Sequence, residues 1–250
     1  MTHKDETDFG FSRVAPAEKT RRVRAVFESV APRYDLMNDL MSAGLHRLWK
    51  RQAVNMLDIR PGHMVLDLAG GTGDMTRLMR INGSTGRAVS ILSDINAAML
   101  THGRDRLLNE GLAAGIDYVQ ADAESLPFRP RSLDRICIAF GLRNVTDKVK
   151  ALRAAYEALR FGGLYLILEF SQLKLRALEP LYDAYSFQWL PWLGQRIAGD
   201  ADSYRYLAES IRRHPDQNTL SAMLQQAGFD RVDYTNLAGG IVAVHRAWKI

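Results

Sequence analysis

Short apolar runs alternate with helix-like patterns over most of the chain. Five of these runs are apolar on both faces, which is typical of buried strands in a parallel sheet: residues 64–69, 88–93, 116–121, 135–140 and 164–170. Helical periodicity fills the gaps, and glycines mark where helices end: about 73–81, 95–110 before Gly111, and 147–160 before Gly162 and Gly163. This alternation predicts an α/β fold of the Rossmann-like, doubly wound kind, with a mostly parallel sheet.

Three segments do not fit the simple alternation. Residues 1–60 carry helical periodicity before any strand is expected, which predicts an N-terminal helical segment or lid. An insert at about 172–215 is longer than a crossover needs and rich in Tyr and Trp, which predicts a helical, functional cap. Residues 231–237 and 241–248 predict a closing antiparallel hairpin. We therefore divide the chain into residues 1–60 and a main domain of residues 61–250.

The composition argues against several classes of protein. The chain of 250 residues has one cysteine and six histidines without an i, i+4 pair, so a disulfide framework is excluded and no metal site is expected. No apolar run reaches the roughly 18 residues of a transmembrane helix, and the polar N-terminus resembles neither a signal nor a transit peptide. A cytoplasmic protein is therefore expected. The net charge of +5 is dispersed, and without a recognisable binding motif no nucleic-acid partner is expected.

A glycine loop follows the first of these strands and precedes a helix. In the segment Asp67-Leu-Ala-Gly-Gly-Thr-Gly-Asp74, the glycines allow a ligand to approach the backbone, and the helix N-terminus offers free N–H groups. The dinucleotide motif G-x-G-x-x-G is incomplete because Thr76 occupies its third glycine position. The Lys of a phosphate-binding P-loop is missing as well. The loop therefore predicts a nucleoside ligand without a pyrophosphate.

Carboxylates at successive strand ends complete this pattern. Asp94 ends the second predicted strand, where it can accept hydrogen bonds from two ribose hydroxyls. Asp122 ends the third, where it can accept from the amine of adenine. Turn or cap chemistry explains any one of these acids alone. Together with Asp67 they surround one crevice, repel phosphates and favour a sulfonium, which indicates S-adenosylmethionine as a methyl donor.

The residues after the fourth strand restrict the methyl acceptor. Methyltransferases that act on exocyclic amines of bases usually carry an Asn/Asp-Pro-Pro-aromatic motif there, whereas this chain has Phe140-Gly-Leu-Arg-Asn144. Methylation of a base carbon through a cysteine nucleophile is also unsupported. Cys137 lies within an apolar run, where burial raises the pKa of a thiol and leaves it inert. Covalent catalysis is therefore excluded.

Several long stretches closely resemble the ubiquinone/menaquinone biosynthesis C-methyltransferase family, a group of class I S-adenosylmethionine-dependent methyltransferases. They are spread over the chain: residues 34–49 (YDLMNDLMSAGLHRLW), 66–74, 140–147, 169–171, 182–187 and 201–210. The resemblance implies C-methylation of a polyprenylated hydroquinol in menaquinone or ubiquinone biosynthesis. The acceptor would be demethylmenaquinol, 2-methoxy-6-polyprenyl-1,4-benzoquinol, or both.

The same resemblance implies the cofactor contacts. The family's S-adenosylmethionine-binding positions match Thr72, Asp94 and the pair Asp122-Ala123. Family members often have Ser where this chain has Ala139, and some have Asn in place of Asp122. With the glycine loop included, the expected cofactor-binding residues are Asp67, Gly71, Thr72, Gly73, Asp94, Ile95, Asp122, Ala123 and Ala139.

Methylation of a ring carbon needs an activated acceptor. A phenolic hydroxyl has a pKa of roughly 10, so a base or a hydrogen-bond partner should help to remove its proton, and the reduced quinol should be the substrate. The candidate catalytic residues are Arg143 and Asn144 beside the expected methyl position, His46 in the N-terminal stretch and Tyr204 in the insert. A surface ion pair, a structural histidine and a helix-capping network are the alternatives for Arg143, His46 and Tyr204. Neighbouring candidates are Tyr34, Asp35, Asn38, Asp202 and Arg205.

The expected partners follow from the same residues. The aromatic insert suits a polyprenyl tail, although packing of the cap alone would use the same side chains. Residues 19–30 place apolar side chains on one face, which fits transient contact with the inner face of an anionic bacterial membrane or a lid helix packed on the domain. A quinone biosynthesis complex and a homodimer are further expectations. Two other functions stay open: O-methylation of a small phenol, and a non-catalytic S-adenosylmethionine-binding role in such a complex.

Overall fold

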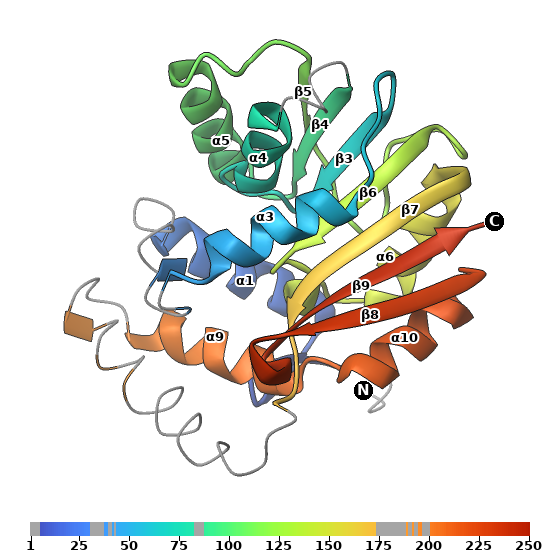
Figure 1. Cartoon of the computed structure of the whole chain (residues 1–250). Helices are drawn as coiled ribbons and strands as arrows, with labels where there is room; N and C mark the ends of the chain where they lie inside the picture. Colours follow the sequence, from blue (N-terminus) through green and yellow to red (C-terminus); the bar gives the residue numbers. More distant parts are fainter. Residues whose placement is uncertain are drawn as a thin grey trace.

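The computed structural model describes residues 6–30, 38–39, 42, 44–82, 88–173, 189, 192, 195–196 and 201–250. A seven-stranded sheet with the order β5-β4-β3-β6-β7-β9-β8 runs through the molecule (Figure 1). Its strands are β3 Met64–Leu68, β4 Val89–Asp94, β5 Ile116–Gln120, β6 Leu133–Ala139, β7 Leu159–Phe170, β8 Arg231–Leu237 and β9 Val242–Lys249. The strands from β3 to β7 pair in parallel, while β9 is antiparallel to both β7 and β8. The predicted α/β sheet and its C-terminal hairpin are therefore confirmed.

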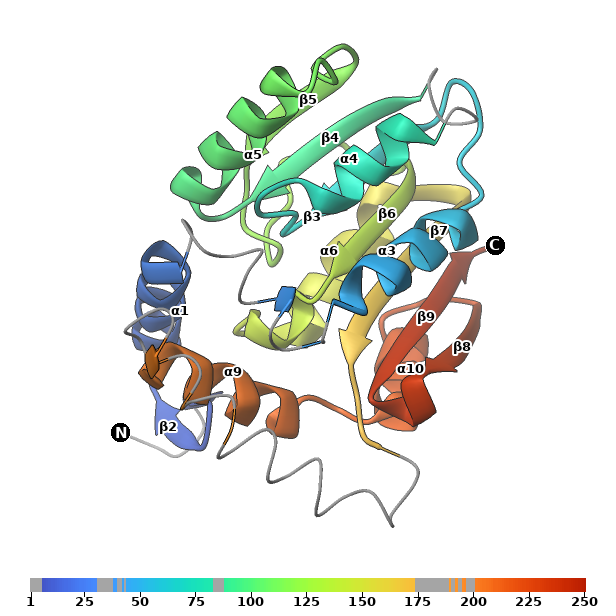
Figure 2. The ribbon, with the colours of Figure 1, turned by 60° about the vertical axis from the view of Figure 1, so that its left-hand side comes forward.

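Helices cover both faces of this sheet, because its central strands are apolar on both sides. One face carries α3 (His46–Met56), α4 (Asp74–Ile81) and α5 (Ala97–Asn109), and the other carries α6 (Lys148–Ala158) and α10 (Gln217–Gln226) (Figures 1 and 2). Alternate strand residues face opposite ways: Cys137 and Leu166 belong to the cluster that includes α3, whereas Ile136 and Tyr165 belong to the cluster with α6 and α10. The resulting two-sided core holds the strand ends in place.

Two further helices lie beyond the carboxyl ends of the parallel strands. They are α1 (Pro16–Val30) and α9 (Ala201–Arg213), which are neighbours in both views (Figures 1 and 2). A short 3₁₀ helix, η4 (Leu142–Asn144), follows β6 and contacts α9. These three elements are far apart in sequence, yet they converge where open α/β sheets bind ligands.

The N-terminal segment differs from its prediction in one respect. Before α1, the strands β1 (Thr7–Phe9) and β2 (Ser12–Val14) form a small antiparallel hairpin, so the expectation of no strand in the first 60 residues is wrong. Strands of three residues are too short to produce a recognisable period-2 pattern. The hairpin is tied to α9, since the backbone N–H of Phe11 donates to the Glu209 carboxylate at 3.0 Å.

The helix predicted over residues 147–160 ends earlier than its glycines suggested. Its last residue lies directly before Leu159, where β7 begins. Gly162, with a φ of +78°, lies inside the strand at a point where the pairing with β6 changes register between Leu133 and Arg135. The expected helix stop is therefore a β-bulge, a feature that needs the same left-handed glycine conformation.

The cap insert is described in part. Its final section is α9, so that section is helical as predicted. Tyr182, Tyr185 and Phe187 of the insert, like Tyr34 and Asp35 near the N-terminus, lie outside the described residues. Among the residues that the structure describes, no helix combines the length and apolar character needed to cross a bilayer.

Candidate functional site

A cavity of about 280 Å³ opens at the carboxyl ends of the parallel strands. Its wall combines residues from the strand ends with residues of α1. The strand-end contribution is Leu68, Ala69, Gly71, Asp94, Ile95, Asn96, Met99, Gln120, Ala121, Asp122, Ala123, Glu124, Phe140, Gly141, Asn144, Val145 and Thr146, and α1 adds Thr20, Val23, Arg24 and Phe27. We refer to the wall formed by residues 68–124 as the cofactor half and to the wall formed by α1 and residues 140–146 as the acceptor half.

The glycine loop between β3 and α4 leaves no room for side chains. A Cβ atom on Gly70 would lie 2.4 Å from Leu92 Cδ1 and 2.7 Å from Asp67 Cγ, and Gly71 has a φ of +56°. The N–H of Gly71 donates to Asp94 Oδ2 at 2.9 Å, which ties the loop to the end of the neighbouring strand. The loop is thus held open to the cavity with its backbone exposed to a ligand.

Asp67 precedes this loop, binds the start of α4 and is not among the residues that line the cavity. It is fully buried, and its Oδ2 accepts hydrogen bonds from the Thr76 N–H at 2.9 Å and the Thr76 hydroxyl at 2.7 Å. Burial raises the pKa of Asp67 to about 6, against the lowering effect of these hydrogen bonds. Asp67 faces α4, because strand residues alternate and its neighbours Leu66 and Leu68 face the other way. Its cofactor contact stays a prediction.

Asp94 does reach the cavity, at the end of β4. Its Oδ2 accepts from Gly71 as described, and its Oδ1 accepts from the N–H of Asn96 at 2.8 Å. The residue is 9% exposed, and burial raises its pKa to about 6 against these backbone hydrogen bonds. Each carboxylate oxygen has a second lone pair, so Asp94 can accept hydrogen bonds from a ligand while the backbone donors hold it in place.

Asp122, Ala123 and Ile95 lie on the same wall as Asp94. The strand β5 ends at Gln120, so Asp122 follows it by two residues and forms an isolated bridge with Ser125. Asp122 is exposed, and its Oδ1 accepts from the N–H of Glu124 at 2.9 Å. Ile95 is 43% exposed, which is high for an isoleucine and leaves an apolar surface beside the acids.

Thr72, Gly73 and Ala139 lie behind the wall of the cavity. Thr72 is 8% exposed, and its hydroxyl has no hydrogen-bond partner among the residues that the structure describes. Gly73 precedes α4 with a φ of +79°, and Ala139 is half-buried against the cluster that includes α3. Five of the nine expected cofactor residues therefore line the cavity itself, namely Gly71, Asp94, Ile95, Asp122 and Ala123.

Arg143 forms a buried ion pair in the acceptor half. Its Nη1 donates to Glu169 Oε1 at 2.8 Å, and the two side chains are 3% and 2% exposed. The same Nη1 donates to the carbonyl of Phe140 at 2.6 Å, and the backbone N–H of Arg143 donates to Glu169 Oε2 at 3.2 Å. The ion pair named as the alternative for Arg143 is thus present, but it is buried and does not lie on the surface. The pair fixes η4 to the end of β7.

Asn144 is the candidate catalytic residue that lines the cavity. The hydroxyl of Tyr206 on α9 donates to Asn144 Oδ1 at 3.1 Å. Burial raises the pKa of Tyr206, so this hydroxyl stays protonated near neutral pH. Since the amide oxygen is occupied, the Asn144 amide nitrogen remains as a donor at the cavity.

His46 and Tyr204 do not join this group. His46 is 4% exposed, and its Nε2 is 2.9 Å from Asp39 Oδ1 beside a different cavity. Burial lowers the pKa of His46, and Lys50 lowers it further. Tyr204 is 1% exposed within the hydrophobic cluster on the α3 side of the sheet. Neither residue is among those that line the first cavity, because His46 contacts Asp39 and Tyr204 is buried in this cluster. Their roles at the acceptor stay predictions.

The helix α1 closes the acceptor half. Lys19 is 2% exposed, and its Nζ donates to the carbonyl of Val145 at 3.0 Å. Thr20 and Thr146 place their hydroxyl oxygens 3.3 Å apart. Burial lowers the pKa of Lys19 to about 8. A buried amine bound to the loop after η4 makes α1 a specific cover for the cavity, which agrees with the lid alternative for this helix.

Three of these residues were missed as site residues from the sequence: Glu169, Tyr206 and Lys19. Glu169 carried a signal, since a carboxylate inside an apolar strand implies a buried partner. Lys19 and Tyr206 gave none, because their partners Val145 and Asn144 are 126 and 62 residues away. Within the described ranges, no group of three His, Cys, Asp or Glu side chains is arranged to hold a metal ion.

Known proteins resemble this chain at both the sequence and the fold level. A model described as the ubiE/COQ5 methyltransferase family matches residues 15–249. The ubiquinone/menaquinone biosynthesis C-methyltransferase UbiE of Marinomonas sp. (strain MWYL1) is 55% identical over 247 residues, 98% of each chain. The protein of the same name from Escherichia coli O139:H28 is 56% identical over the same shares. A solved SAM-dependent methyltransferase from Thermotoga maritima superposes with a TM-score of 0.62 at 18% identity, covering 90% of this chain and 99% of that one.

Proposed function

Since the chain belongs to the ubiE/COQ5 methyltransferase family and is an S-adenosylmethionine-dependent C-methyltransferase, we propose that it methylates a ring carbon of a polyprenylated hydroquinol. The proposed acceptors are demethylmenaquinol and 2-methoxy-6-polyprenyl-1,4-benzoquinol. One observation carries the proposal: the cavity joins the acids Asp94 and Asp122 to the amide of Asn144 in a single space. The proposed transfer uses no metal ion.

The residues of the cofactor half fit S-adenosylmethionine. When bound, this donor supplies a methyl group on a positively charged sulfur. Asp94 is proposed to accept hydrogen bonds from the ribose hydroxyls, and Asp122 with Ala123 to bind the adenine edge. Ile95 would pack on the adenine ring with its exposed side chain. The glycine at 71 lets the amino-acid part approach the backbone. Two carboxylates on one wall disfavour phosphates, which is consistent with a sulfonium ligand.

The acceptor half is suited to hold a phenolate. We assign to the amide nitrogen of Asn144 a hydrogen bond to the ring hydroxyl of the acceptor, which stabilises its deprotonated form. Tyr206 orients this amide through the 3.1 Å hydrogen bond to its oxygen. Arg143 is a positioning residue in this scheme, because its ion pair with Glu169 fixes the 3₁₀ helix that carries Asn144. Alignment of the ring carbon with the donor then supplies most of the rate enhancement.

The lid and the insert are proposed to bind the polyprenyl tail. Val23 and Phe27 of α1, together with Phe140 and Val145, give the acceptor half an apolar lining. Residues 1–60 are proposed as the lid segment, with residues 61–250 as the methyltransferase domain. The lid role belongs to the part before His46, because α3 packs in the core with β3.

The insert and the protein's location complete this proposal. Trp189 and Trp192 of the insert are 57% and 51% exposed, with ring centroids 6.0 Å apart. Exposed tryptophans suit the interface of a bilayer that holds the lipid substrate. A cytoplasmic protein with transient contact at the inner membrane face is therefore proposed. A homodimer and a quinone biosynthesis complex remain part of this proposal as well.

The test uses the purified full chain, labelled S-adenosylmethionine and a demethylated polyprenyl quinol, with and without a reductant. Transfer of label to a ring carbon, only in the presence of reductant, is the expected result. An O-methyl ether as product would contradict the proposed chemistry. Binding of the donor without transfer to either a benzoquinol or a naphthoquinol would favour the non-catalytic role.

A further inference from the structure

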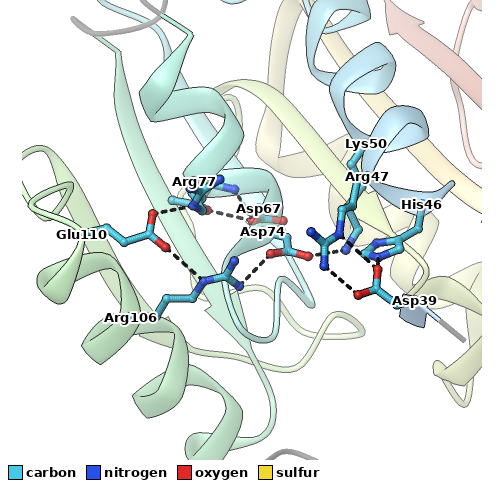
Figure 3. Close-up of polar contacts among 10 residues, drawn as sticks. Asp39, His46, Arg47, Lys50, Asp67, Asp74, Arg77, Arg106 and Glu110 are labelled. Atoms are coloured by element: carbon cyan, nitrogen blue, oxygen red, sulfur yellow. Dashed lines mark hydrogen bonds and ion pairs between the residues drawn. The ribbon is translucent and has the colours of Figure 1, made fainter. Parts of the chain in front are cut away.

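A second cavity of about 190 Å³ lies between α3, α4 and α5, and it shares no lining residue with the first. Its wall is dominated by cationic side chains, several of which appear in Figure 3: His46, Arg47, Lys50, Arg51, Asp74, Arg77, Leu78 and Arg106. The proposed methyl transfer makes no use of this cavity.

The wall of this cavity carries many more cations than acids. Five of its side chains are permanently positive, whereas Asp74 is the one carboxylate among its described lining residues. Asp39 and Glu110 pair with these cations from outside the wall. His46 adds no positive charge near neutral pH, because burial and the neighbouring Lys50 lower its pKa.

The carboxylates hold the cations in fixed positions. Asp74 accepts from Lys50 Nζ at 2.6 Å and from Arg106 Nη1 at 2.7 Å, so one acid bridges α3 and α5 (Figure 3). Despite its burial, these two cations lower the pKa of Asp74 to about 2. Arg47 donates to both oxygens of Asp39, at 2.6 and 3.1 Å. A ligand would therefore meet prearranged donors and lose less conformational entropy on binding.

Arg51 is a cation of the wall that does not belong to these ion pairs. Within the described part of the chain it takes part in no ion pair and no side-chain hydrogen bond, and it is exposed. It lies four residues after Arg47 on α3, on the same helix face, which directs both toward the same space. The exposed surface of this cavity therefore presents an unneutralised guanidinium.

We propose that this cavity binds a phosphate group. Guanidinium groups match the geometry of phosphate oxygens with paired hydrogen bonds, and the cationic wall with the unpaired Arg51 favours a negatively charged group. The first cavity differs in this respect, because its carboxylates disfavour a phosphate group. The phosphate comes from one of two sources, the head group of an anionic phospholipid or a free phosphate compound.

The first experiment titrates inorganic phosphate into the full chain by calorimetry, at constant ionic strength maintained with chloride. Arg51→Gln is compared with Arg104→Gln, which removes the same charge from α5, where Arg104 pairs with the adjacent Asp105. Both side chains are exposed, so both variants should fold. Loss of one charged hydrogen bond should weaken phosphate binding by about tenfold in Arg51→Gln. Arg104→Gln should change it by less than about twofold.

The second experiment distinguishes the two sources. Sedimentation with phosphatidylcholine vesicles is compared in the presence and absence of phosphatidylglycerol. Weaker sedimentation of Arg51→Gln, but not of Arg104→Gln, with the anionic vesicles identifies a lipid head group. Phosphate binding without vesicle binding identifies a free phosphate compound.

Three results would overturn the proposal. They are no binding of phosphate or of anionic vesicles by the unmodified chain, equal weakening in both variants, and a loss of S-adenosylmethionine affinity in Arg51→Gln with phosphate binding unchanged. The last result would assign the cavity to the carboxylate of the cofactor. None of them bears on the methyl acceptor, so the proposed function is tested separately.

Discussion

The two halves of the main cavity are built in different ways. In the cofactor half, Asp94 is held by the backbone N–H groups of Gly71 and Asn96, all of which lie at the ends of adjacent strands or directly after them. In the acceptor half, Asn144 and Arg143 are held by side chains of α9 and β7. The sheet itself therefore fixes the donor site, whereas the acceptor site depends on a few side-chain pairs between distant elements. Substitutions in one half should therefore affect that site more than the other.

The largest effect is expected from Glu169→Gln, in the acceptor half. The substitution preserves shape but leaves the Arg143 guanidinium buried without its counter-charge, so the free energy of unfolding should fall by about 3–5 kcal/mol. Chemical denaturation measures this change. The control is the double variant Glu169→Gln with Arg143→Met, which removes both charges and should regain much of the stability without regaining methyl transfer. A loss below about 1 kcal/mol in the single variant would show that the pair does not hold η4.

The same contrast explains which parts the sequence could predict. The strands of the sheet, the glycine loop and Asp94 are local features, because periodicity and strand ends lie within a few residues of one another. The direction of the Asp67 side chain is a feature that the sequence leaves open. The position of Asp67 in the loop motif is visible from the sequence, but its direction depends on the alternation of β3 and on Thr76 of α4.

The acceptor half was less accessible, because its contacts join elements far apart in the chain. Tyr206 has no local pattern that connects it to Asn144, 62 residues earlier. The glycines at 162 and 163 show a second limit. A bulge and a helix end require the same positive φ, so composition cannot distinguish them. His46 and Tyr204 belong to stretches that resemble the family, but this resemblance does not give the direction of a side chain. His46 contacts Asp39, and Tyr204 lies in the buried cluster on the α3 side of the sheet.

In the cofactor half, Asp94→Ala should lower the affinity for S-adenosylmethionine by about a hundredfold or more, because two charge-assisted hydrogen bonds to the ligand and the anchor of the glycine loop are lost together. Calorimetry with the donor measures this affinity. Asp94→Asn keeps the shape and should lose less. An unchanged affinity in Asp94→Ala would move the ribose to another part of the cavity. The free energy of unfolding should change less in Asp94→Ala than in Glu169→Gln.

A lower pH should weaken the binding of S-adenosylmethionine by the cofactor half. The pKa of Asp94 is about 6 in the folded chain against an ordinary value of 3.8, so its carboxylate takes up a proton as the pH falls through 6. Binding of S-adenosylmethionine needs the ionised form, and its affinity should fall by about tenfold between pH 7 and pH 5. The stability of the free protein should change in the opposite direction. Between about pH 6 and pH 4 the folded state binds more protons than the unfolded state, so unfolding becomes less favourable.

A variant assigns this pH dependence to its residue. Asp94→Asn should bind the donor with an affinity that varies less below pH 7. Asp67 has a similarly raised pKa and should account for the remainder through the start of α4. If the unmodified chain and Asp94→Asn have the same pH profile, Asp94 is not the group that titrates.

The smallest effect expected is that of Tyr206→Phe, and it sharpens the comparison most. The substitution removes one hydroxyl that orients the Asn144 amide, and a neutral hydrogen bond contributes about 1 kcal/mol. We expect kcat for the quinol to fall about fivefold, while the Kd of S-adenosylmethionine stays the same. Asn144→Ala, measured alongside, should lose more activity than Tyr206→Phe, and Tyr206→Phe in that background should cost little further activity because the two residues act as one unit. A change in the Kd of the donor in Tyr206→Phe would mean that the two halves of the cavity are coupled.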